Sequence, residues 1–120
     1  MKIYFLRPNF DLTLIKKPQD GKQRIQVDRK MTIGRNGPKV DIQLYAPTVS
    51  KEHVIVEPTQ EGLLAKNICG RSNVKLNGVF SDEALLDNGS TLEILSFPFT
   101  VEALSEEELT SARAETIFPG

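Results

Sequence analysis

Five residues that suit an anion-binding site lie within a span of twenty positions. Gly34 and Arg35 close a short apolar segment, and Ser50, Lys51 and His53 follow in "SKEH". At the mouth of a loop, the planar guanidinium of Arg35 can hold a phosphate through two hydrogen bonds, and a hydroxyl and an ammonium add further donors. The spacing therefore predicts a small anion site built by Arg35, Ser50 and Lys51 on two neighbouring loops.

Enzymatic chemistry is poorly supported by the residues. His53 is the only histidine and alternates in phase with Ile55, so it lacks the signs of a base beside a nucleophile. The carboxylates at 82–83 and 106–108 imply no partner and are typical of a solvated surface. The single cysteine, Cys69, belongs to no Cys/His cluster with metal-ligand spacing. We predict a binding module that is not an enzyme and needs neither a cofactor nor a metal.

The composition is that of one ordinary soluble domain. The chain has 120 residues, of which 39% are apolar and 26% charged. The N-terminal apolar run is broken by Arg7 and Pro8, so it lacks the core of a signal peptide, and no later run is long enough for a membrane span. One cysteine fits a reducing compartment. We expect a cytosolic or nuclear protein.

Charge is divided unevenly between the two halves of the chain. Residues 1–54 hold 11 basic and 5 acidic residues, and residues 55–120 hold 4 basic and 11 acidic ones. Folding can interleave the halves and average this difference out. Alternatively, a basic face could bind an anionic ligand while an acidic surface lies elsewhere. The basic stretch 16–30 lacks interleaved aromatic residues, so direct nucleic-acid binding is not expected.

Short apolar segments recur with turn signals between them, which is typical of a β-sandwich or barrel. Alternation of apolar and polar residues indicates half-buried strands at four pairs of core positions: Ile25 and Val27, Met31 and Ile33, Ile42 and Leu44, and Val54 and Val56. Hairpin turns are expected at 58–62, 77–78 and 87–89, and at "PQDG" in 18–21. We expect strands at 2–6, 12–16, 24–27, 31–34, 41–44, 53–57, 63–68, 75–76, 91–94 and 100–104.

The C-terminal segment differs from the rest. Ser105 and Glu108 have the spacing of a capping box, and acidic residues would fill the first turn of a helix. A short helix and a linker tail are both compatible with this pattern. We therefore divide the chain into a β-domain at 1–104 and a C-terminal helix or linker at 105–120.

These motifs resemble the forkhead-associated (FHA) domain, a two-sheet β-sandwich that binds phosphothreonine peptides. Gly34 and Arg35 match its Gly-Arg, Ser50 to His53 match its Ser-x-x-His, and Asn77 and Gly78 match its final Asn-Gly. The resemblance covers almost the whole chain and implies an all-β fold of about ten to eleven strands. Within this family, the sequence most resembles the N-terminal FHA domain of DNA-damage checkpoint mediator proteins.

The resemblance implies a role for each matching residue. Arg35 and Ser50 would hold the phosphate, Lys51 would add charge, and His53 would brace the loops. Gly34, Asn77 and Gly78 would be structural.

The third motif departs from the family pattern in "RSNVKLNG". Counting back from Asn77, Ser72 stands where the family has the asparagine that clamps the peptide backbone. Asn73 then replaces a glycine, where an asparagine could adopt the left-handed conformation, and Val74 replaces a threonine. A one-residue gap would instead place Asn73 at the family's asparagine. Ser72 and Asn73 are therefore both candidates for contacting the peptide.

Two functions follow from the resemblance. The first is a nuclear scaffold module of the DNA-damage response that binds a phosphothreonine-containing protein. The second is a homodimerisation module that has lost phosphothreonine binding, for which "KIYFL" at 2–6 and "FPFTVEAL" at 97–104 could offer exposed strand edges. Thr59, in a Thr-Gln pair, is a candidate phosphorylation site in a combination of the two. Neither the partner nor the oligomeric state follows from the residues.

Overall fold

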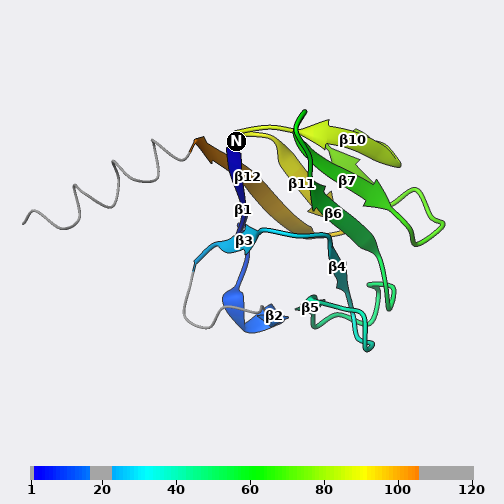
Figure 1. Ribbon diagram of the computed structural model, residues 1–120. Coiled ribbons are helices and arrows are strands. Elements are labelled where there is room, and N and C mark those ends of the chain that lie inside the picture. The colour runs from blue at the N-terminus through cyan, green and yellow to red at the C-terminus, as the bar shows by residue number, and fades with distance from the viewer. Residues whose placement is uncertain (1, 17–22, 106–120) are drawn as a thin grey trace, which may run out of the picture.

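Two six-stranded sheets pack face to face in the computed structural model, which describes residues 2–16 and 23–105 (Figure 1). The first sheet contains, in spatial order, β3 (Ile25–Val27), β1 (Lys2–Pro8), β12 (Phe97–Ser105), β11 (Thr91–Ile94), β8 (Val74–Leu76) and β9 (Val79–Phe80). The second contains β10 (Glu83–Leu86), β7 (Leu63–Asn67), β6 (Val54–Pro58), β4 (Met31–Gly34), β5 (Ile42–Leu44) and β2 (Ile15–Lys16). The predicted all-β sandwich is confirmed, with twelve strands in the described residues.

Alternating side chains from both sheets form one core. Strand side chains point to opposite faces in turn, so every second residue faces the other sheet. Leu6, Phe99 and Val101 come from the first sheet, and Ile33 and Val56 come from the second; all are buried. Burying each such side chain stabilises the fold by about 1.5–3 kcal/mol. The alternation that predicted the core at 25–27, 31–33, 42–44 and 54–56 is confirmed.

The predicted strands agree with the structure except in three places. The strand expected at 12–16 is a 3-10 turn (η1, Leu12–Leu14) followed by the short β2, because the Asp11 carboxylate accepts hydrogen bonds from the amide and hydroxyl of Thr13. The strands β9 and β10 were not predicted. Both are edge strands with mostly exposed side chains, so they lack an alternating apolar signal.

Two of the expected hairpin turns are present. The 58–62 turn joins β6 to β7, and Asn77 and Gly78 join β8 to β9 with positive φ values of 54° and 79°. The prediction for 87–89 is wrong, because this segment passes from β10 in one sheet to β11 in the other. The turn at 18–21 lies outside the described residues, as does the C-terminal helix or linker expected at 105–120, except for Ser105, which is the last residue of β12.

The proposed exposed edges at 2–6 and 97–104 are not edges. β1 pairs with β12 on one side and β3 on the other, and β12 pairs with β1 and β11. Each strand therefore has a hydrogen-bonded neighbour on both sides over part of its length. The outermost strands of the two sheets are β3, β9, β10 and β2. In the described part of the chain, no helix has the length and apolar character needed to cross a membrane.

Three loops meet at one end of the sandwich. β4 and β7 both run antiparallel to β6. The last residues of β4, the first residues of β6 and the last residues of β7 therefore lie at the same end of the sandwich. We call this the loop end; it consists of the loops 35–41, 45–53 and 68–73. Figure 1 shows the first two of these loops at the lower right, away from the N-terminus. The tertiary fold thus brings the Gly-Arg and Ser-Lys-x-His segments together.

Candidate functional site

Arg35 is held in place by the neighbouring loop. Its amide donates a hydrogen bond to the carbonyl of Ser50 at 2.9 Å, and its Nε donates to the carbonyl of Val49 at 3.0 Å. These contacts leave the two terminal nitrogens of the guanidinium without a hydrogen bond to any described residue. Because the backbone and Nε are already fixed, little conformational freedom remains to be lost when an anion binds.

Gly34 allows the loops to approach this closely. A Cβ atom at Gly34 would lie 2.0 Å from the carbonyl oxygen of Lys51 and 2.7 Å from its carbonyl carbon. No side chain fits in such a space, and the obstructing atoms belong to the backbone. A glycine is therefore required at the end of β4 by the close approach of the 45–53 loop, and not by its own φ angle.

Ser50 lies beside Arg35, and the Lys51 backbone lies beside Gly34. Both backbone groups of Ser50 are engaged, since its carbonyl accepts from Arg35 and its amide donates to Nδ1 of His53 at 3.0 Å. Its hydroxyl makes no hydrogen bond to a described residue. Lys51 is exposed, and its ammonium is in no ion pair with the described residues. Arg35, Ser50 and Lys51 thus present a guanidinium, a hydroxyl and an ammonium at the loop end.

His53 connects the second loop to the third. It is 0% exposed, and its Nε2 lies 2.8 Å from Oδ1 of Asn73. Because the amide of Ser50 can only donate, Nδ1 must be unprotonated, and the proton of the neutral ring is on Nε2, where it donates to Asn73. Burial is the largest cause that lowers the pKa of His53, and the positive charge of Arg71 lowers it further, against the opposing effect of the Asn73 hydrogen bond.

In the third loop, Asn73 and not Ser72 is hydrogen-bonded to His53. Oδ1 of Asn73 accepts from His53 and from the thiol of Cys69 at 3.2 Å, whereas Ser72 is exposed without a hydrogen bond to a described residue. Asn73 also has no positive φ, so the expected left-handed conformation is wrong. The left-handed residue of this loop is Gly70, with φ of 81°. The side-chain amide of Asn73 retains its two donor hydrogens at the loop end.

Val74, Asn77 and Gly78 lie outside the cluster. Val74 is fully buried at the start of β8 and packs in the core. Asn77 and Gly78 form the turn at the other end of β8, where Oδ1 of Asn77 accepts from the amide of Thr91 at 3.0 Å. This turn anchors the β8–β9 hairpin to β11 and contacts none of the anion-binding candidates.

Arg71 was missed by the sequence-based assignment. It is exposed on the third loop, and its guanidinium makes no hydrogen bond or ion pair with a described residue. Its carbonyl accepts a hydrogen bond from the amide of Asn73 at 3.0 Å, which places the Arg71 backbone beside the asparagine that bonds to His53. The signal available in the sequence was a lone arginine in "CGRSN", which is indistinguishable from an ordinary surface residue until the loops are brought together.

Buried neutral His53 makes the stability of the fold depend on pH. The folded-state pKa is lowered from the ordinary 6.5, so below pH 6.5 the unfolded chain binds a proton more readily than the folded chain. We expect the free energy of unfolding to fall on acidification below pH 6.5, by up to about 1.4 kcal/mol per pH unit. Urea unfolding between pH 5 and 8 measures this change. In His53→Gln, which keeps a donor and an acceptor, the loss of stability below pH 6.5 that His53 causes should disappear. Parallel curves for the two proteins would contradict the assignment.

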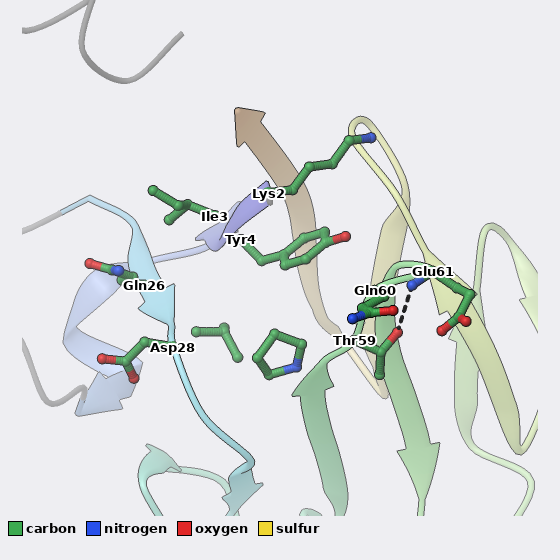
Figure 2. Close-up of a pocket in the computed structure, with 10 residues that line it drawn as sticks. Lys2, Ile3, Tyr4, Gln26, Asp28, Thr59, Gln60 and Glu61 are labelled. Carbon is green, nitrogen blue, oxygen red and sulfur yellow. Dashed lines mark hydrogen bonds between the residues drawn. The ribbon is translucent and has the colours of Figure 1, made fainter. Parts of the chain in front are cut away.

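A cavity of about 840 Å³ lies at the opposite end of the sandwich, between the start of β1, the end of β3 and the 58–62 turn (Figure 2). Thr59 lines it, but its hydroxyl donates to the carbonyl of Gly62 at 2.7 Å and accepts from the amides of Glu61 and Gly62. Thr59 therefore closes the β6–β7 turn. Among the described residues, no group of three or more His, Cys, Asp or Glu is arranged to hold a metal ion.

The FHA domain family model matches residues 31–95, more than half of the chain. The chain belongs to the FHA domain family. The match begins with β4 and ends just after β11, so it includes all three loops of the loop end. No curated protein sequence is significantly similar to the chain.

Solved structures share the fold at low sequence identity. The FHA domain of CT664 from Chlamydia trachomatis has a TM-score of 0.67 at 12% identity, covering 86% of this chain and 99% of that one. EmbR from Mycobacterium tuberculosis, in complex with a low-affinity phosphopeptide, has a TM-score of 0.67 at 16% identity, covering 86% of this chain and 25% of that one. The MEK1 FHA domain, in complex with a HOP1 phosphothreonine peptide, has a TM-score of 0.62 at 20% identity, covering 82% and 94%.

Proposed function

We propose that this FHA domain binds phosphothreonine-containing proteins through its loop end. The proposal rests on the arrangement of Arg35, whose Nε and amide donate to the carbonyls of Val49 and Ser50, while its terminal nitrogens make no hydrogen bond to a described residue. A phosphate with two charges and three acceptor oxygens matches a guanidinium fork, a hydroxyl and the Lys51 ammonium. Structures with bound phosphopeptides exist for similar domains, including EmbR and MEK1.

Asn73 takes the role of the peptide-clamping asparagine in this proposal. Its Oδ1 is committed to His53 and Cys69, so its amide hydrogens are oriented by a buried partner and can donate to a peptide carbonyl. Ser72, which lacks such an anchor, is a contact from the same loop. His53, buried beneath the loops, positions Ser50 and Asn73 without touching the ligand. This assignment corresponds to the one-residue gap in the third motif.

The biological setting is proposed on the resemblance described above. We place the domain in a nuclear scaffold of the DNA-damage response, most like the N-terminal FHA domain of checkpoint mediator proteins. The boundary between this domain and a C-terminal helix or linker is proposed near residue 105, where β12 ends. FHA domains are interaction modules, which fits a role without catalysis, metal or cofactor.

The proposal is tested by titrating the purified chain with degenerate phosphothreonine peptides and with the same peptides unphosphorylated. Binding that requires the phosphate is the expected result, with a dissociation constant on the order of micromolar because few residues are gripped. Equal or absent binding of both libraries would overturn the proposal.

A homodimerisation module is the second candidate. It is favoured by exposed apolar side chains at two outer strands, Val79 (65% exposed) and Phe80 (60%) on β9 and Leu85 (52%) on β10. Outer strands with apolar side chains can pair with another copy. If this surface dimerises, the unphosphorylated chain should sediment at twice 13.4 kDa, and Phe80→Ser should return it to a monomer. A wild-type monomer at tens of micromolar would exclude a stable dimer of this kind.

A further inference from the structure

The basic side chains of the loop end form no ion pair with the residues that the structure describes, although ion pairs are formed elsewhere. The three loops hold four basic residues, Arg35, Lys39, Lys51 and Arg71, and two acidic ones, Asp41 and Glu52. Asp41 is already occupied, because it pairs with Arg29 at 3.0 Å and accepts from the amide of Thr32. The ion pairs of the described residues use Lys2, Arg7, Arg24 and Arg29, none of which lies in these loops.

One phosphate does not need all of these cations. A phosphothreonine carries about −1.5 to −2 charges near pH 7, which Arg35 and Lys51 can balance. Arg71 lies on the third loop, two positions before Asn73. A series of hydrogen bonds through Asn73, His53 and Ser50 connects its backbone to that of Arg35. The Arg71 guanidinium is therefore available for a second anionic group beside the phosphate.

The third loop holds the backbone of Arg71 firmly. The carbonyl of Arg71 accepts from Nδ2 of Asn67 at 2.6 Å and from the amide of Asn73 at 3.0 Å, and its amide donates to the Cys69 sulfur at 3.4 Å. A fixed backbone aims the side chain at a limited region and reduces the entropy lost on binding. Such an anchored arginine can contribute to specificity, whereas an arginine on a loosely held loop contributes chiefly a diffuse field.

We infer that Arg71 is a specificity residue that selects phosphothreonine peptides with an acidic residue close to the phosphothreonine. This inference rests on the proposed phosphothreonine binding and adds the chemistry of the ligand's flanking positions. Arg71 pairs with the flanking carboxylate, while Arg35, Ser50 and Lys51 hold the phosphate. The preferred partner is accordingly a protein phosphorylated within an acidic segment.

The test compares two degenerate phosphothreonine libraries by fluorescence anisotropy at about 0.15 M salt. In one library the three residues on each side of the phosphothreonine are drawn from Ala, Gly, Ser and Gln; in the other, Asp and Glu are added. Both are also made without phosphate. The proteins are wild type, Arg71→Gln, and Lys30→Gln as a matched loss of one exposed positive charge beside the opposite end of β4.

Wild type is expected to bind the acidic library roughly three- to tenfold more tightly than the neutral one. In Arg71→Gln this preference should shrink to less than about twofold while the neutral library is bound nearly as before, and Lys30→Gln should keep the preference. Equal binding of the two phosphorylated libraries by wild type, or a preference that survives Arg71→Gln, overturns the inference and leaves phosphothreonine binding intact. Failure of wild type to bind either phosphorylated library overturns the proposed function itself and this inference with it.

Discussion

Replacing Arg35 by alanine is expected to weaken phosphothreonine-peptide binding by about 100-fold or more. Two charge-assisted hydrogen bonds to the phosphate would be lost, each contributing about 1.5–3 kcal/mol, and every 1.4 kcal/mol is a factor of ten in affinity. The loss is largest at Arg35 because its Nε is already fixed by the carbonyl of Val49, so its free nitrogens are aimed before the ligand arrives.

Two further variants separate the geometry of Arg35 from its charge. Arg35→Lys keeps a positive charge without the planar fork and should lose most of the affinity, because an ammonium cannot make the paired hydrogen bonds. Lys30→Gln removes a charge beside the far end of β4 and should change affinity less than about twofold. Circular dichroism should show the same fold in all three. An affinity of Arg35→Ala equal to that of wild type would contradict the assigned site.

Gly34→Ala is expected to destabilise the domain by about 3 kcal/mol or more. The added methyl group would meet the Lys51 carbonyl oxygen at 2.0 Å, and the obstacle is backbone that cannot rotate away like a side chain. Relief requires the 45–53 loop to move, which would break the contact from the Arg35 amide to Ser50 and disturb the link from Ser50 to His53. Overpacking of this kind typically costs 1–3 kcal/mol, and the rigid neighbour places Gly34 at the upper end.

Gly70→Ala is the matched control for Gly34→Ala. Nothing lies within 4 Å of a Cβ atom at Gly70, so its only cost is the positive φ of 81°, about 1–2 kcal/mol. Urea unfolding of both variants measures the difference. A smaller loss of stability for Gly34→Ala than for Gly70→Ala would show that the 45–53 loop moves at little cost. The close approach of that loop would then not explain why position 34 is a glycine.

The sequence indicated the fold where the signal was local. Alternation at Met31 and Ile33 and at Val54 and Val56 located central strands, because residues facing the core must be apolar at every second position. The same reasoning failed at 79–80 and 83–86, since outer strands with exposed side chains need no such pattern. It also failed at 12–14, where a single carboxylate, Asp11, favours a turn over an extended strand.

The order of the strands within each sheet could not be predicted from the sequence, for a different reason. The apolar segments at 2–6 and 97–104 suggested exposed edges, yet each is paired on both sides. Strands pair with segments that lie far apart in the chain. An apolar strand has the same sequence pattern at the edge of a sheet as inside it, so the pattern does not show which position the strand takes. Among the described residues, the large apolar side chains with the greatest exposure are instead on the outer strand β9, at Val79 and Phe80.

By itself, the sequence determined the alternating core and the Gly34–Arg35 and Ser50-to-His53 segments as candidates for an anion site. Only the tertiary structure decided that Asn73, and not Ser72, bonds to His53, and that the Arg71 backbone contacts Asn73 while its guanidinium pairs with no described residue. Residue type and spacing are properties of neighbouring positions. The choice between two adjacent loop residues depends on a hydrogen bond across 20 positions to a buried ring, which exists only once the two sheets have packed.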